Sequence, residues 1–217
     1  MAEATHIITQ IETQKRNVHR LNIYLNGTFA FGLEEEVALR HHLHEGDRLK
    51  ESTIEEILLV EERTRAKEKA LRLLAYRMRS VEELRKKLHE KGFTERIIEP
   101  VIQDLLRVGL LDDQQFATAY VQTRMVQKPM STQLLRQELS FKGIGNDIAE
   151  QVIEEEYGAR SETEVAVGLA RKKMEQYRSG RIESKKMRKK VSDFLLRRGF
   201  NWDVIGEVMR EIDIGQF

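Results

Sequence analysis

The chain has 217 residues, with no cysteine and 2 prolines, and its 37 Lys and Arg residues nearly balance its 36 Asp and Glu residues. The lack of cysteine excludes a disulfide framework, thiol chemistry and thiolate metal sites. Charged residues make up 34% of the chain, a composition typical of helices with solvated faces.

The first ten residues, MAEATHIITQ, lack the basic region and apolar run of a secretory signal. No segment of the sequence approaches the roughly 18 consecutive apolar residues that a membrane-spanning helix needs. We therefore expect a cytoplasmic protein without a membrane segment.

Residues 6–33 differ from the rest of the chain, because they show the alternation and the β-branched and aromatic residues of strands. Between two of the runs lies Asn26-Gly27, a strong signal for a two-residue hairpin turn. We expect a small antiparallel sheet of three strands. It should pack on a short helix that starts near Glu34 and on the long helix after it, so that residues 1–50 form an N-terminal region.

One stretch of the remaining chain recurs. Residues 80–93 read SVEELRKKLHEKGF, residues 131–144 read STQLLRQELSFKGI, and residues 182–200 end in KVSDFLLRRGF. In each copy, apolar residues recur four and eight positions before the glycine and five and nine positions after it, which keeps them on one helical face. Each copy therefore predicts a helix, a glycine stop at positive φ, and a second helix.

The three glycines, Gly92, Gly143 and Gly199, are 51 and 56 residues apart, which indicates internal repetition. A further helix precedes each copy. We predict a mainly α fold of three tandem three-helix repeats, similar to helix-turn-helix modules, in an elongated curved array. The predicted boundaries are 51–110 for the long helix and repeat one, 111–158 for repeat two and 159–217 for repeat three.

Capping residues predict where the helices start. Capping boxes are expected to open helices at Ser52, Ser80 and Ser161. Other caps are expected at Thr94, in the Asp112-Asp113 pair, at Asn146 or Asp147, and at Asn201. Pro100 predicts either a kink in the helix after Thr94 or a later start of that helix.

Charge is segregated along the chain. Residues 33–62 carry ten Asp and Glu against three Lys and Arg, whereas residues 63–91 carry eleven Lys and Arg against four acidic residues. Residues 171–198 carry twelve Lys and Arg against three acidic residues. Such blocks indicate a charged partner, but solvated faces of lysine-rich helices give the same composition, and both interpretations stay open.

Motifs for catalysis or cofactor binding are missing from the sequence. There is no P-loop, and the GIG at residues 143–145 lacks the third glycine and the preceding strand of a dinucleotide site. His41, His42 and His44 resemble a metal cluster, but adjacent histidines on a helix point about 100° apart, so we prefer a structural role. We expect no catalytic residues, no metal site and no cofactor.

In a helix-turn-helix module that reads DNA sequence, the last helix presents Arg, Lys and Asn to the bases. Here the last helices are acidic or mixed, as in TERIIEPVIQDLL and NDIAEQVIEEEY, and basic residues fall on the middle helices. Sequence-specific reading is therefore disfavoured, whereas a basic stripe could follow a phosphate backbone or an extended protein. The candidate contact residues are Arg79, Arg85, Lys86, Arg124, Arg136, Lys142, Lys172, Lys173, Arg178, Lys185, Lys186, Lys189 and Lys190.

A specific set of motifs covers about residues 70–157. The set is YRMRSVEELRKKLHEKGF at residues 76–93, GLLDD at residues 109–113, Phe116-Ala117 with Tyr120, and QELSFKGI at residues 137–144. These motifs closely resemble those of the RecX family, whose members regulate the bacterial recombinase RecA.

The resemblance implies three tandem three-helix repeats in a protein that lies in the groove of the RecA–DNA filament. It further implies inhibition, or other modulation, of ATP hydrolysis, strand exchange and SOS co-protease activity. We expect a monomer. The alternative hypothesis is a protein that binds single- or double-stranded DNA without specificity through a basic helical stripe, and a scaffold for an unrelated partner is a third.

Overall fold

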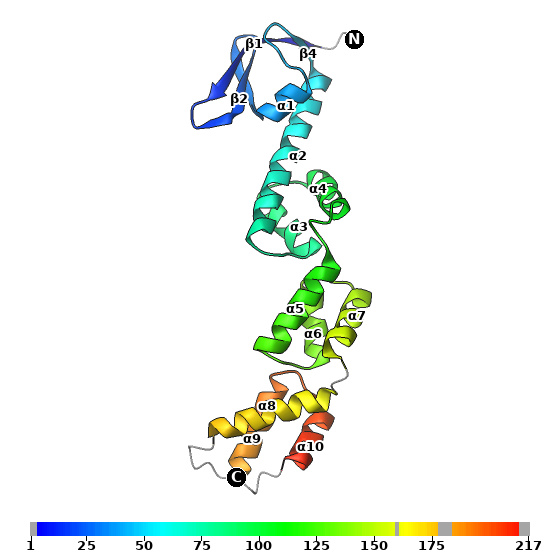
Figure 1. Cartoon of the computed structure of the whole chain (residues 1–217). Coiled ribbons are helices and arrows are strands. Elements are labelled where there is room, and N and C mark those ends of the chain that lie inside the picture. Colours follow the sequence, from blue (N-terminus) through cyan, green and yellow to red (C-terminus); the bar gives the residue numbers. More distant parts are fainter. Residues whose placement is uncertain (1–3, 159–160, 178–183, 213–217) are drawn as a thin grey trace. The chain divides into compact units, whose positions relative to one another are not determined.

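A computed structural model describes residues 4–158, 161–177 and 184–212. The chain forms two compact units. The first contains Met1–Met78 and Leu84–Leu111, and the second contains Arg79–Glu83 and Asp112–Phe217. Among the described residues the fold is mainly helical, with one sheet built from the N-terminal part of the chain (Figure 1). The predicted mainly α fold with an N-terminal antiparallel sheet is confirmed.

The sheet belongs to the first unit and has four antiparallel strands in the order β3-β2-β1-β4. The strands are β1 (Thr5–Gln14), β2 (Asn17–Leu25), β3 (Thr28–Glu34) and β4 (Arg48–Lys50). The expected three-stranded sheet is wrong by one strand, because β4 has 3 residues, too few to show an alternating pattern. The hairpin turn is confirmed, since Asn26 and Gly27 have φ values of 51° and 83°, as such a turn requires.

Helices α1 (Glu35–Arg40) and α2 (Glu51–Tyr76) pack against this sheet (Figure 1). Alternation along the strands and the helical period turn apolar residues to a common core, which is led by Ile8, Ile23, Leu33, Val37 and Ile57. Helix α2 begins after Lys50 without a side-chain cap, so the predicted capping box at Ser52 is wrong.

The other helices fall into three equivalent sets. The first set is the C-terminal half of α2 with α3 (Val81–His89) and α4 (Glu95–Arg107). The second is α5 (Asp113–Gln127), α6 (Thr132–Phe141) and α7 (Asn146–Tyr157), and the third is α8 (Glu162–Tyr177), α9 (Ser184–Leu196) and α10 (Trp202–Glu211). Equivalent positions are buried in every set, namely Ala66, Ala117 and Ala166 in the first helix, Leu88, Leu139 and Leu195 in the middle helix, and Val101, Val152 and Val208 in the last helix. The predicted threefold repeat is confirmed.

Each middle helix ends at a glycine corner with the expected backbone. The φ values of Gly92, Gly143 and Gly199 are 88°, 78° and 84°. The N–H group of the residue after each glycine donates to the carbonyl oxygen five positions earlier, at 3.3, 3.1 and 3.2 Å. These bonds satisfy carbonyl groups that the end of a helix would otherwise leave without a partner.

In the second unit, a serine packs against each glycine corner. Ser80 donates its hydroxyl to the carbonyl oxygen of Lys142 at 2.5 Å. At the equivalent position, the backbone N–H of Ser131 donates to the carbonyl oxygen of Arg198 at 2.9 Å. Both serines are almost fully buried, at 0% and 1% exposed. The residue that caps a middle helix therefore also binds the glycine corner of the following repeat.

An acidic residue completes this joint at both places. Asp113, at the start of α5, accepts the N–H of Val81 at 2.8 Å. Glu162, at the start of α8, accepts the N–H of Thr132 at the same distance. Since the joint recurs with equivalent residues, the repeat extends from the helices to the contacts between them.

The predicted caps have mixed outcomes. Side-chain oxygens of Ser80, Asp112, Ser161 and Asn201 accept backbone N–H groups of the first helical turn, as predicted. Ser131, which was not among the expected caps, accepts the Leu134 N–H in the same way. Thr94 caps α4 by position but without a side-chain hydrogen bond. The N-cap of α7 is Gly145, so the caps expected at Asn146 or Asp147 are wrong. Helix α4 begins before Pro100, so the later start is wrong as well.

Replacing Ser131 by alanine is expected to destabilise the second unit by about 1 kcal/mol, because the Leu134 N–H then loses its cap in a buried place. Urea unfolding followed by far-UV circular dichroism measures this change. The matched control is Thr94→Ala, where no side-chain cap bond exists, and its cost should be clearly smaller. Equal costs for the two variants would contradict the capping role of Ser131.

Candidate partner-binding surface

Several of the predicted contact residues form ion pairs within the protein. Arg85 of α3 binds the carboxylates of Glu95 and Glu99, the latter at 2.8 Å. The Arg136 guanidinium of α6 donates hydrogen bonds to both carboxylate oxygens of Glu150, at 2.5 and 3.0 Å. The hydrogen bond from Arg136 lowers the pKa of Glu150. These two arginines already have carboxylate partners, which a binding protein or DNA would have to displace.

Arg124 and Lys142 lie in a cluster around the ring of Tyr120, from which their charged groups are 5.1 and 4.9 Å away. Arg124 also pairs with Glu138 at 2.8 Å, and Lys142 pairs with Glu83 at 2.8 Å. The Tyr120 hydroxyl donates to Glu138 at 2.5 Å, and burial together with this bond raises the pKa of Tyr120. Both cations are thus neutralised by carboxylates of the chain.

Two more predicted residues offer little to a partner in this structure. Arg79 is 9% exposed, which leaves almost no surface for a partner. Lys86 is exposed but makes an interaction within the chain. Arg178 lies outside the described residues.

The lysines of the third set of helices have different surroundings. Lys173 and Lys190 lie over the ring of Tyr177, each 5.1 Å from its centroid. Among the described residues, Lys172, Lys185 and Lys189 form no ion pair, and all three are exposed. We call this group the third-repeat basic surface, and its members are Lys172, Lys173, Lys185, Lys186, Lys189 and Lys190.

A groove lies beside this surface in the second unit, and sequence reasoning did not find it. It encloses about 670 Å³ between the end of α5, the segment after α5, and helices α8 and α9. Its lining residues are Met125, Val126, Gln127, Pro129, Glu164, Val165, Gly168, Leu169, Lys172, Lys173, Gln176, Phe194 and Arg198. These residues come from three separate segments, so no local pattern in the sequence marks the groove.

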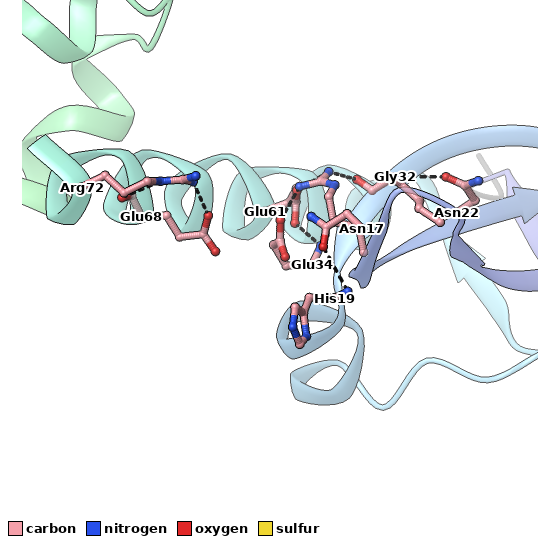
Figure 2. A network of polar contacts seen from close by, with 10 residues as sticks. Asn17, His19, Asn22, Gly32, Glu34, Glu61, Glu68 and Arg72 are labelled. Carbon is pink, nitrogen blue, oxygen red and sulfur yellow. Dashed lines mark hydrogen bonds and ion pairs between the residues drawn. The ribbon is translucent and has the colours of Figure 1, made fainter.

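The first unit has a buried polar network that fastens the sheet to α2 (Figure 2). Arg20 of β2 donates to the Glu34 carboxylate at 2.5 Å and pairs with Glu61 of α2 at 2.9 Å. The other carboxylate oxygen of Glu61 accepts the N–H of Glu34 at 2.7 Å. Glu61 is 5% exposed, so this network holds the fold together and does not face a partner.

Next to this network lies a polar hollow of about 610 Å³. Its basic residues on α2 are Arg65, Lys69 and Arg72, spaced so that they share one helical face. Arg72 pairs with Glu68 at 2.8 Å, as Figure 2 shows. The basic block of residues 63–91 pointed to this region, but the candidate list did not include these three residues.

Metal binding and membrane insertion find no support among the described residues. No group of three or more His, Asp and Glu side chains in residues 4–158, 161–177 and 184–212 is arranged to hold a metal ion. None of the described helices is both long and apolar enough to cross a membrane.

Four protein-family models match most of the chain. The model of the regulatory protein RecX N-terminal domain matches residues 6–50. The models of the first, second and third three-helix domains of RecX match residues 66–105, 112–153 and 161–209. Regulatory protein RecX of Bacillus licheniformis is 32% identical, over 95% of this chain and 77% of its own length. The chain belongs to the RecX family.

Other RecX proteins agree with this assignment. Regulatory protein RecX of Halalkalibacterium halodurans is 34% identical, over 97% of this chain and 79% of its own length. A crystal structure of regulatory protein RecX matches with a TM-score of 0.71 and 32% identity, over 95% of this chain and 100% of that one. RecX from Lactobacillus salivarius matches with a TM-score of 0.61 and 28% identity, over 71% of this chain and 99% of that one. The RecX fold therefore extends over the sheet and the repeats.

Proposed function

We propose that this chain regulates the RecA recombinase, mainly as an inhibitor, by binding in the groove of the RecA–DNA filament. The observation that carries the proposal is the third-repeat basic surface in a member of a family of regulatory proteins. A filament of protein and DNA offers phosphates and carboxylates. Lys172, Lys185 and Lys189, which form no ion pair among the described residues, can bind these groups directly, whereas Arg85 and Arg136 would first have to break an ion pair.

The chain acts as a cytoplasmic monomer, with no cofactor and no catalysis of its own. Lying in the groove, it restrains the filament and so modulates ATP hydrolysis, strand exchange and SOS co-protease activity. Because the attraction is between charges exposed to water, binding should weaken as salt concentration rises.

Reversing the charge of Lys185, Lys186, Lys189 and Lys190 to glutamate is expected to weaken filament binding at least tenfold and to abolish inhibition of the RecA ATPase. All four side chains are exposed, and exposed substitutions usually change the free energy of unfolding by less than about 0.5 kcal/mol each. Filament binding and ATPase rates measure the effect, and circular dichroism verifies that the variant is folded.

A matched control makes the same change of charge in the first unit. Lys15, Arg16, Lys67 and Arg96 are also exposed, and their reversal to glutamate should leave the inhibition nearly unchanged. Unchanged inhibition by the third-repeat variant would refute the assignment of the basic surface.

Non-specific DNA binding through the same lysines is the alternative, because exposed lysines also neutralise phosphates. It predicts tight binding to naked DNA that falls steeply with salt, and inhibition that disappears when DNA is in large excess. A titration of filament ATPase at two DNA concentrations separates the two hypotheses. Inhibition that follows the ratio of this chain to RecA at both concentrations supports regulation of RecA.

A further inference from the structure

The groove of the second unit has an apolar floor and basic walls. Val126, at the end of α5, is 83% exposed, which is unusual for a valine beside other apolar side chains. Gly168 of α8 opens the floor further, because a Cβ at this position would meet no atom within 4 Å. Lys172, Lys173 and Arg198 supply three positive charges.

Two cations of this groove, Lys173 and Arg198, occupy positions in the repeat that are equivalent to those of the Tyr120 cluster. The first helices of repeats two and three align on their buried residues, Ala117 with Ala166 and Val121 with Ala170. This alignment pairs Arg124 with Lys173. The residues that precede the corner glycines form the second equivalent pair, Lys142 with Arg198.

The two carboxylates that neutralise Arg124 and Lys142 in the Tyr120 cluster have no counterparts beside Lys173 and Arg198. Glu138 lies four positions before Lys142, and Phe194 lies four positions before Arg198. Likewise, Glu83 follows the capping Ser80 by three positions, and Leu134 follows the capping Ser131 by three positions. Both carboxylates are therefore replaced by apolar side chains.

No other carboxylate of the described residues takes their place. Lys173 donates to the Gln176 side chain at 3.0 Å, and Arg198 donates to the Pro129 carbonyl at 2.9 Å. Both also lie over the Phe194 ring, at 5.5 and 5.1 Å from its centroid. The one acidic residue among those lining the groove, Glu164, accepts the backbone N–H of Ser161 as part of a capping box.

We propose that the groove holds an acidic segment of a protein partner. Carboxylates of that segment take the places that Glu83 and Glu138 fill in the Tyr120 cluster and pair with Lys173 and Arg198. A large apolar side chain of the same segment lies on the floor, against Leu169. The proposal deepens the proposed function, because it rests on the RecA filament as the protein that supplies the segment.

A peptide fits this groove better than DNA does. The floor is largely aliphatic, whereas bases that bind proteins without sequence specificity stack on aromatic rings. Phe194, the aromatic ring of the lining, already carries two cations. Removing aliphatic surface from water favours an occupant that itself has an apolar group beside its negative charge.

Phe194→Glu introduces a carboxylate at the position that is equivalent to Glu138. This variant is expected to bind a RecA filament on single-stranded DNA at least tenfold more weakly. Gly168→Leu fills the floor without changing the charge and should have an effect of similar size. The matched controls are Gln133→Glu on the exposed face of α6 and Gly206→Leu in α10, where a Cβ also meets no atom within 4 Å. Fluorescence anisotropy of the labelled chain gives the dissociation constants, and circular dichroism verifies folding.

Because the chain has no cysteine, a Val126→Cys variant can carry a single benzophenone at the lip of the groove. Irradiated on the purified filament, it should cross-link to a RecA peptide of net negative charge that contains a large apolar residue. A cross-link to the DNA strand or to a basic peptide would overturn the inference. If the unmodified chain does not bind the filament, the proposed function fails too. If it binds and Phe194→Glu and Gly168→Leu bind equally well, only the groove assignment fails.

Discussion

Replacing Gly199 by alanine is expected to destabilise the second unit by about 2–5 kcal/mol. A left-handed backbone costs a residue with a Cβ roughly 1–2 kcal/mol, and Gly199 has a φ of 84°. The new Cβ would also lie 2.6 Å from the Cβ of Leu134, an overlap that forces the packed segments apart and costs about 1–3 kcal/mol more. Urea unfolding followed by circular dichroism measures the sum.

Gly92 provides the control for this experiment. Its φ of 88° is nearly the same, but a Cβ there would meet no atom within 4 Å, so Gly92→Ala should show the backbone cost alone, about 1–2 kcal/mol. Gly143→Ala should resemble Gly199→Ala, because its Cβ would lie 2.7 Å from the Cγ of Glu82. If all three variants lost the same free energy of unfolding, the close packing at Gly143 and Gly199 would not contribute to the cost of the substitution.

Replacing Glu61 by alanine is expected to destabilise the first unit by about 3 kcal/mol. The change leaves Arg20, whose side chain is 20% exposed, with one carboxylate instead of two, and it leaves the N–H of Glu34 without its acceptor. Breaking one side of a buried ion pair typically costs 3–5 kcal/mol, and the partial exposure of Arg20 places this case at the low end. Thermal unfolding of the chain measures the loss.

Glu61→Gln is the control that separates charge from hydrogen bonding. Its amide oxygen can still accept the Glu34 N–H, so we expect a smaller loss than for alanine. A double-mutant cycle with Arg20→Ala gives the interaction energy of the pair. An interaction energy near zero would show that Glu61 stabilises the first unit without Arg20, through its packing and its hydrogen bond to the Glu34 N–H.

Much of the helical architecture could be predicted because it depends on neighbours in the sequence. The corner glycines follow from helical spacing and from the positive φ that a helix end requires, and both were confirmed at Gly92, Gly143 and Gly199. The caps at Ser161 and Asn201 were confirmed for the same reason, since each bond spans three residues. The failures at Ser52 and Asn146 show that a capping residue near a helix start does not fix which residue begins the helix.

The candidate site could be predicted only in part. Composition pointed to the lysines of α8 and α9, and the structure places them on the surface. Composition could not show that Arg136 is paired with Glu150, 14 residues away, or that Lys142 is paired with Glu83, 59 residues away. The list of contact residues therefore mixed cations that have internal carboxylate partners with cations that have none.

By itself the sequence determined the repeat, the helices and their glycine corners, because helix formation and helix ends are set by residues within about four positions of one another. Tertiary structure alone decided which cations are neutralised, where a three-residue strand completes the sheet, and that a groove opens beside Phe194. These features arise where distant segments meet. The pairing of a charge depends on distances in space of about 3–4 Å, and the spacing of residues along the chain does not fix such distances.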